Sequence, residues 1–148
     1  MKRNDIEYTM DADITAIEEC AQYARGDTIS DRIADKADSL VDVYDRDAID
    51  WGARHPEWVD EAANNGLIDA SSTGGNLLAR AAQAGQYEYY LHMLYENKAA
   101  IALNYAFDYM DADEIPDELA EQIIDAADGL DTFAEIEQII DDYKADHE

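Results

Sequence analysis

Carboxylates dominate the side chains of this sequence that could do chemistry, because thirty-six aspartates and glutamates occur among its 148 residues. A pair of carboxylates can act as general acid and general base when an apolar or like-charged pocket separates the two pKa values. Acidic pairs occur along the whole chain, so spacing distinguishes none of them. We therefore expect a solvated acidic face and no catalytic pair.

Calcium is the first metal that such a sequence suggests. An EF-hand loop needs glycine at its sixth position and a bidentate glutamate at its twelfth. Counting from Asp111, which is followed by Asp113 and Asp117, those positions hold Pro116 and Gln122. The sequence therefore predicts loose divalent binding at most, and no dedicated calcium site.

Zinc and nucleophilic chemistry require other residue types at set spacings. The three histidines, His55, His92 and His147, and the lone Cys20 form no such cluster in the sequence, and no G-x-S-x-G motif occurs. Nothing assembles a nucleophile, a base and an oxyanion site. We expect no metal, no cofactor and no enzymatic activity.

The net charge of −26 at pH 7 is the most unusual property of the chain. Only ten lysines and arginines are present, and residues 108–142 contain fourteen acids and no base. Ion pairs within the helices cannot neutralise that segment. Such a charge repels nucleic acid and anionic membranes and speeds association with basic proteins. We therefore expect a basic protein as the partner, and neither direct nucleic-acid binding nor membrane binding.

The length suits one domain, residues 1–148, with a core that needs no disulfide or metal. The apolar fraction of 47% argues against disorder, and one cysteine excludes an internal disulfide. No apolar stretch follows the first five residues, so we expect no signal peptide and a soluble, cytoplasmic protein.

Apolar residues recur at helical spacing nearly throughout, and no alternating strand pattern is sustained. We expect an all-α, compact domain of about six to eight helices. In the first half, a helix over residues 14–24 should stop near Gly26, and a second should start near Thr28 or Ser30. The remaining expectations for this half are short helices over residues 47–53 and 56–64 and a loop over residues 69–75.

In the second half, residues 76–110 form a long helical region with expected breaks near Gly85 and Asn97. Pro116 should open a helix over residues 116–127 that Gly129 closes. Thr132 and Glu135 have the spacing of a capping box and should start the last helix, over residues 132–144.

The long helical region is rich in tyrosine. Tyr87, Tyr89, Tyr90 and Tyr95 could stack on nucleic-acid bases, but proteins that do so surround their aromatic residues with lysine and arginine, which are scarce here. Core packing is the better interpretation for most of these residues, with a minority at a protein interface. If the chain forms a homodimer, residues 86–110 are where we expect the contact.

Two resemblances can be stated. The pattern of residues 31–51, from Asp31 to Trp51, and that of residues 86–97 look like patterns in uncharacterised small acidic proteins of phages and mobile elements. By its acidic and helical character the chain is also similar to DNA-mimic inhibitors, among them phage antirestriction and anti-CRISPR proteins. That resemblance implies carboxylates placed where a target enzyme expects phosphates.

The spacing of carboxylates on helices is compatible with such mimicry. Duplex DNA presents one charge about every 1.7 Å along its axis. Acids three or four residues apart on a helix lie roughly 5–6 Å apart, and two neighbouring antiparallel helices can interleave their rows. The helices expected over residues 116–127 and 132–144 would provide such a double row. The predicted partner-binding residues are Asp111, Asp113, Glu114, Asp117, Glu118, Glu121, Asp125, Asp128, Asp131, Glu135, Glu137, Asp141 and Asp142.

The resulting functional prediction is an acidic binding protein that occupies a basic, nucleic-acid-binding surface of another protein, as a DNA-mimic inhibitor of a host defence nuclease. One alternative is a structural or assembly protein of a phage or mobile element, in which the acids only maintain solubility. Another is a helical domain adapted to high salt, although abundant isoleucine and tyrosine fit that class less well. An acidic chaperone or an antitoxin is physically close to the mimic, and only the identity of the partner separates these.

Overall fold

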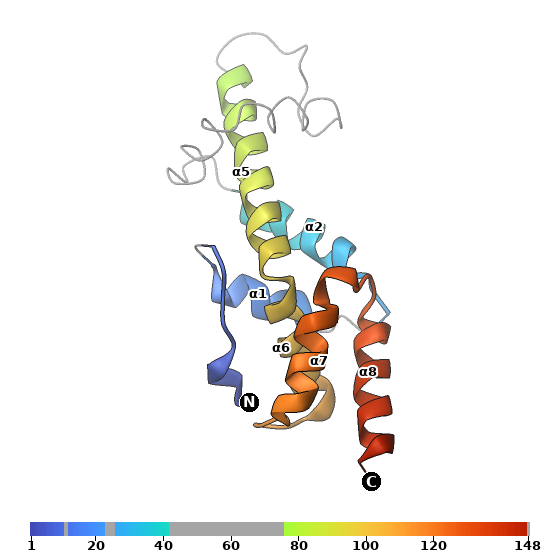
Figure 1. Ribbon diagram of the computed structural model, residues 1–148. Coiled ribbons are helices and arrows are strands. Elements are labelled where there is room, and N and C mark those ends of the chain that lie inside the picture. Colours follow the sequence, from blue (N-terminus) through green and yellow to red (C-terminus); the bar gives the residue numbers. More distant parts are fainter. Residues whose placement is uncertain (11, 23–25, 42–75, 148) are drawn as a thin grey trace. The chain divides into compact units, whose positions relative to one another are not determined.

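The computed structural model describes residues 1–10, 12–22, 26–41 and 76–147 (Figure 1). These residues form α-helices and two short 3-10 helices and include no strand, so the all-α prediction is confirmed. Two isolated bridges, Lys2 with Glu114 and Thr28 with Thr132, join backbone segments outside the helices. The elements in order are η1 (Arg3–Asp5), α1 (Ile14–Ala21), α2 (Ile29–Leu40), α5 (Asn76–Glu96), α6 (Lys98–Met110), α7 (Asp117–Ala126), η2 (Ala127–Gly129) and α8 (Phe133–Asp146).

The chain divides into two compact units. The larger unit consists of Met1–Lys36 and Met93–Glu148, and the smaller unit consists of Ala37–His92. Helices α1, α6, α7 and α8 belong wholly to the larger unit. In the smaller unit, the described part of α5 buries Gln86, Glu88 and Tyr90.

Helix α6 is the centre of the larger unit, because it packs against α1, α7 and α8. Every residue from Ala100 to Phe107 is buried, which is expected when neighbours cover a helix on all sides. Burying one large apolar side chain of this kind contributes about 1.5–3 kcal/mol. Around α6, the apolar stripes of the other helices complete the core with Ile17, Leu119, Ile123, Phe133, Ile136 and Ile140.

The N-terminal segment is attached to the connection between α6 and α7. The Met1 amine donates a 2.7 Å hydrogen bond to the Ile115 carbonyl, and the Ile115 amide returns one of 2.9 Å to Met1. Arg3 pairs with Asp108 at 2.6 Å and lies over the ring of Phe107. The segment therefore covers one side of α6.

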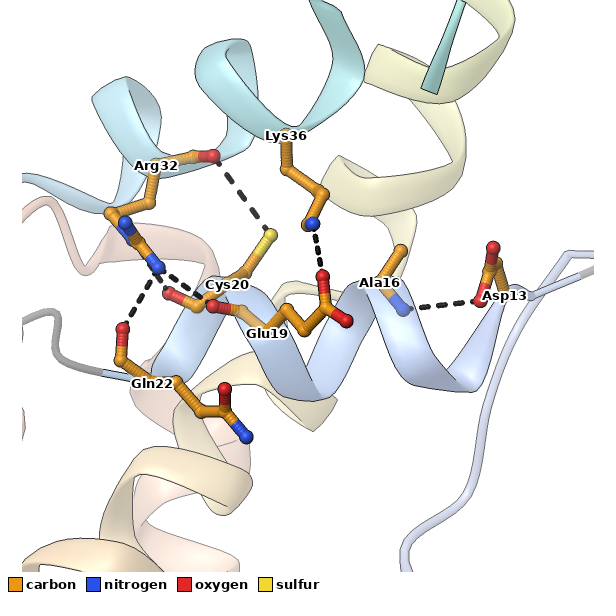
Figure 2. A network of polar contacts seen from close by, with 7 residues as sticks. All are labelled: Asp13, Ala16, Glu19, Cys20, Gln22, Arg32 and Lys36. Atoms are coloured by element: carbon orange, nitrogen blue, oxygen red, sulfur yellow. Dashed lines mark hydrogen bonds and ion pairs between the residues drawn. The ribbon is translucent and has the colours of Figure 1, made fainter. Parts of the chain in front are cut away.

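The guanidinium of Arg32, on α2, closes the C-terminal end of α1 (Figure 2). Its nitrogens donate to the carbonyls of Glu19, Cys20 and Gln22 at 2.7, 3.2 and 2.8 Å. These carbonyls lie at the negative end of the helix dipole, where a cation is favourable. Lys36, one turn further along α2, forms an ion pair with the Glu19 side chain.

Several helix boundaries agree with the sequence patterns. Thr28 accepts a hydrogen bond from the Asp31 amide at the start of α2, and the Thr132 hydroxyl accepts from the Glu135 amide at the start of α8. The break at Asn97 is confirmed. Helix α7 begins and ends within one residue of its predicted bounds.

Two boundary predictions were wrong. Helix α5 continues through Gly85, since one glycine costs only about 1 kcal/mol within a helix of 21 residues. Helix α1 ends at Ala21, because Gln22 has an extended backbone and Arg32 occupies the last carbonyls. The helices predicted over residues 47–53 and 56–64 and the loop over residues 69–75 lie outside the described residues.

Among the described helices, none combines the length and the apolar character that crossing a membrane requires.

Candidate functional site

The thirteen predicted partner-binding acids all lie in the larger unit, and twelve of them are exposed, whereas Glu137 is half-buried. Helices α7 and α8 carry eight of the acids and run in opposite directions, joined through η2 (Figure 1). The other five lie in the connections before α7 and between α7 and α8. The acids on helices are Asp117, Glu118, Glu121 and Asp125 of α7 and Glu135, Glu137, Asp141 and Asp142 of α8.

The helical repeat explains why the α7 acids are exposed. Leu119, Ala120 and Ile123 form the buried face of this helix. Asp117, Glu121 and Asp125 are four residues apart and lie on the opposite face, where each step along the row is about 6 Å. The row continues beyond the helix, because Asp128 in η2 is also exposed.

Six of the thirteen carboxylates are already engaged by neighbouring groups of the chain. The acids of α8 fall into two pairs. Glu137 and Asp141 bond to tyrosines of α6, whereas the bonds that Glu135 and Asp142 make within the described residues stay inside the N-terminal cap and the helix. The six contacts are Asp117 with the Met1 amine (2.6 Å), Glu118 with His147 (3.6 Å), Glu135 with the Thr132 hydroxyl (3.3 Å), Glu137 with the Tyr105 hydroxyl (3.1 Å), Asp141 with the Tyr109 hydroxyl (3.1 Å) and Asp142 with the Gln138 amide (2.8 Å).

The other seven carboxylates, which we call the open acids, make no side-chain hydrogen bond or ion pair with any residue in the described ranges. Their contacts with neighbouring segments involve the backbone: the Asp128 carbonyl accepts from Lys98 at 3.5 Å, the Asp131 carbonyl accepts from Ile29 at 2.8 Å, and Glu114 forms a backbone bridge with Lys2. The open acids are Asp111, Asp113, Glu114, Glu121, Asp125, Asp128 and Asp131.

Two tyrosines of α6 contact acids of α8 that the sequence predicts to bind a partner. Tyr105 and Tyr109 are stacked with ring centroids 6.3 Å apart, and Tyr105 also contacts the ring of Phe133 in α8. Both tyrosines are four residues apart, as are the carboxylates they bond, Glu137 and Asp141. The matched spacing was visible in the sequence, but the facing of α6 and α8 was not.

Burial of the tyrosines of α5 differs from residue to residue. Tyr90 is buried, Tyr87 and Tyr89 are half-buried, and Tyr95 is 43% exposed. Core packing is therefore confirmed for Tyr90 and wrong for Tyr95.

No group of three or more histidine, cysteine, aspartate or glutamate side chains is arranged to hold a metal ion in the described part of the chain. That includes the neighbouring Asp111, Asp113 and Asp117. His92 lies 4.0 Å from Glu88, and His147 stacks on Tyr143. His55 lies outside the described ranges.

Cys20 is fully buried beneath the α1–α2 contact. Burial raises the pKa of its thiol to about 11, although Arg32 and Lys36 act in the opposite direction. A thiol of this kind is protonated at neutral pH and is a poor nucleophile.

Compared with protein-family models, with curated proteins and with solved structures, the chain matches none.

Proposed function

We propose that this chain is an acidic binding protein that occupies a basic, nucleic-acid-binding surface of another protein. The observation that carries the proposal is the set of seven open acids in a segment, residues 108–142, that contains no lysine or arginine. A charge that no side chain in the described ranges compensates is available to a partner. Without one, it contributes mainly self-repulsion.

The arrangement of the open acids supports a partner that normally holds phosphates. Glu121 and Asp125 lie on the outer face of α7, and Asp128 and Asp131 extend this charge toward α8. Side chains one helical turn apart on α7 lie about 6 Å from each other along the helix axis, which is of the same order as the charge about every 3.4 Å along the axis of one DNA strand. A basic groove would therefore meet a regular row of carboxylates whose repeat is of the same order as that of its usual ligand.

The narrower proposal is a DNA-mimic inhibitor that acts in the cytoplasm on a defence nuclease, of antirestriction or anti-CRISPR type. Opposite charge over such an area accelerates encounter and makes association sensitive to salt. Bound in the groove, the open acids would exclude the nucleic acid by occupying the same lysines and arginines.

The first experiment is affinity capture from bacterial lysate at low salt, followed by elution with duplex DNA. The proposal expects a nucleic-acid-binding protein that DNA releases in competition. A partner that DNA does not release would instead support an assembly or chaperone role. The absence of any partner would contradict the proposal.

Charge reversal then tests the surface itself. Lysine at four open acids should lower the affinity for the captured partner by at least about a hundredfold, because each change removes an attraction and adds a repulsion. A matched control reverses four exposed acids outside residues 108–142, whose side chains also form no hydrogen bond or ion pair within the described ranges. The test variant changes Glu121, Asp125, Asp128 and Asp131, and the control changes Asp27, Asp35, Asp38 and Glu96. Equal losses of affinity in the two variants would show that the interaction depends only on the net charge. They would exclude the open acids as a specific binding surface.

A further inference from the structure

A cavity of about 400 Å³ lies between the N-terminal segment, α6 and α7. Its apolar lining comes from Ala99, Ala100 and Leu103 of α6 and from Ile124 of α7. Ile124 is 42% exposed and leaves apolar surface open to solvent. The volume is in the range of cavities that bind small organic groups.

Two acids of the N-terminal segment, Asp5 and Glu7, also line the cavity and are exposed. Asp5 accepts a 3.0 Å hydrogen bond from the Lys2 amide. Glu7 has no hydrogen bond or ion pair with any residue of the described ranges. Met1 also lines the cavity, and its amine is already paired with Asp117. The cavity therefore joins apolar walls to two carboxylates that form no ion pair within the described ranges.

This combination selects among the possible occupants. A purely apolar group would bury the walls but would leave the two carboxylates without a counter-charge, and an anion would be repelled by them. A compact inorganic cation would gain nothing from Leu103 and Ile124. A long aliphatic stem that ends in a positive charge satisfies both parts, because such side chains bury their methylene groups while the charged end stays at the polar edge.

We infer that the cavity receives an arginine or lysine side chain of the protein partner. The inference rests on the proposed function, which supplies a basic partner, and adds a specific contact that does not involve the open acids. The stem would pack on Leu103 and Ile124, and the charged group would reach Asp5 and Glu7. Interfaces commonly concentrate their binding energy in such inserted side chains, and arginine is among the most frequent.

The cavity can be tested without the partner by titrating the isotope-labelled full chain with butylguanidinium, which represents the arginine side chain. NMR should show saturable shifts at the backbone amides of Ala99, Ala100, Leu103 and Ile124. Guanidinium without the stem should give no saturable shift there, and butanol without the charge should bind about fivefold more weakly than butylguanidinium. Butylguanidinium shifts that do not saturate, or that spread evenly over exposed acids, would overturn the inference.

Two test variants and one control separate the contributions of charge and of cavity shape to this binding. D5N/E7Q should weaken butylguanidinium binding about fivefold, since each exposed ion pair contributes about 0.5 kcal/mol. D27N/D35N, which removes the same net charge from exposed positions elsewhere, should leave the binding unchanged. Ala99→Leu fills part of the cavity without changing its charge and should abolish the saturable shifts. Equal affinity in D5N/E7Q and D27N/D35N would contradict a specific role for Asp5 and Glu7.

The outcome also separates this inference from the proposed function. If a DNA-released partner is captured but D5N/E7Q binds it as well as D27N/D35N does, the inference fails and the proposed function stands. If no basic partner is found while butylguanidinium binds in the cavity, the proposed function fails. The inference that the bound cation is a side chain of a protein partner then fails as well.

Discussion

Tyr105 donates a 3.1 Å hydrogen bond from its hydroxyl to Oε1 of Glu137, across the contact between α6 and α8. One turn further along both helices, Tyr109 donates to Asp141 at the same distance. The paired contacts hold two carboxylates of α8 against α6. They also link the buried centre of the larger unit to its acidic surface, since Tyr105 is buried and Asp141 is exposed.

Removing these hydroxyls should lower stability unequally. Tyr105→Phe should decrease the free energy of unfolding by about 1 kcal/mol, because it removes a hydrogen bond to a charged and half-buried acceptor. Tyr109→Phe should cost less, about 0.5 kcal/mol or below, because Asp141 can be solvated in its place. Urea unfolding measures both. A larger loss for Tyr109→Phe than for Tyr105→Phe would contradict this assignment.

Arg32 should be among the most sensitive surface-accessible positions. Arg32→Met keeps most of the aliphatic stem but removes three donors to the carbonyls that end α1, and should lower the free energy of unfolding by about 2 kcal/mol. Lys36→Met removes the ion pair with Glu19 and is the matched control, with an expected loss within about 1 kcal/mol. Chemical denaturation of both variants gives the comparison. Similar losses would show that the end of α1 does not depend on the guanidinium.

Two buried asparagines of the larger unit should respond differently to truncation. Asn97 accepts from the Thr9 amide at 2.6 Å and donates to the carbonyls of Thr9 and Met93, both at 2.7 Å. Asn97→Ala should cost about 2–4 kcal/mol, because it leaves these backbone groups without partners. Asn104 donates to Ala100, but its Oδ1 is buried and has no partner in the described ranges, so Asn104→Ala should cost much less. Urea midpoints measure the difference, and equal losses would refute the role assigned to Asn97.

The contrast between Asn97 and Gly85 shows how far sequence reasoning reaches. Both residues are weak helix formers, and both were expected to interrupt the helical region. Asn97 does so because its side chain bonds to the backbone of Thr9, which is 88 residues away in sequence. Gly85 does not, since its local cost is small compared with the rest of α5. Whether a weak helix former interrupts a helix depends on such distant contacts, and a single sequence does not reveal them.

The candidate surface shows the same limit. Helical periodicity was sufficient to place the α7 acids opposite Leu119 and Ile123, and the capping pattern at Thr132 placed the start of α8. Periodicity could not tell Glu137, which bonds to Tyr105, from Glu121, which is open. That distinction depends on which helix packs beside each acid.

Cys20 should make the stability depend on pH in the alkaline range. The unfolded thiol loses its proton near its ordinary pKa of 9.0, whereas burial keeps the folded thiol protonated up to about pH 11. The folded state therefore binds more protons in this interval, and the free energy of unfolding should fall as the pH rises through it. Cys20→Ala should show a shallower fall over the same interval. Identical pH profiles for the two proteins would contradict the raised pKa.

The same thiol provides an independent measurement. At pH 8 the native protein should react with a disulfide reagent at least about a hundredfold more slowly than the protein in urea, because little thiolate is present and the sulfur is buried. Fast reaction in the native state would show that Cys20 is accessible.

Screening of the −26 net charge should stabilise the folded chain. Raising NaCl from about 0.01 M to about 0.5 M shortens the Debye length from about 30 Å to well below 10 Å and weakens the repulsion among the open acids. The unfolding temperature should rise by about 5 °C or more and then level off. A chain that folds only in molar salt would instead support the high-salt alternative.

Asp111 follows the last residue of α6 with a left-handed backbone, at φ 47°. Glycine adopts this conformation with less strain, and a carboxylate beside the C-terminal carbonyls of a helix meets the unfavourable end of its dipole. The side chain is exposed and is one of the open acids, so no hydrogen bond or ion pair within the described ranges offsets this strain. Glycine at position 111 would therefore stabilise the fold, whereas aspartate adds a negative charge to the surface at the expense of stability.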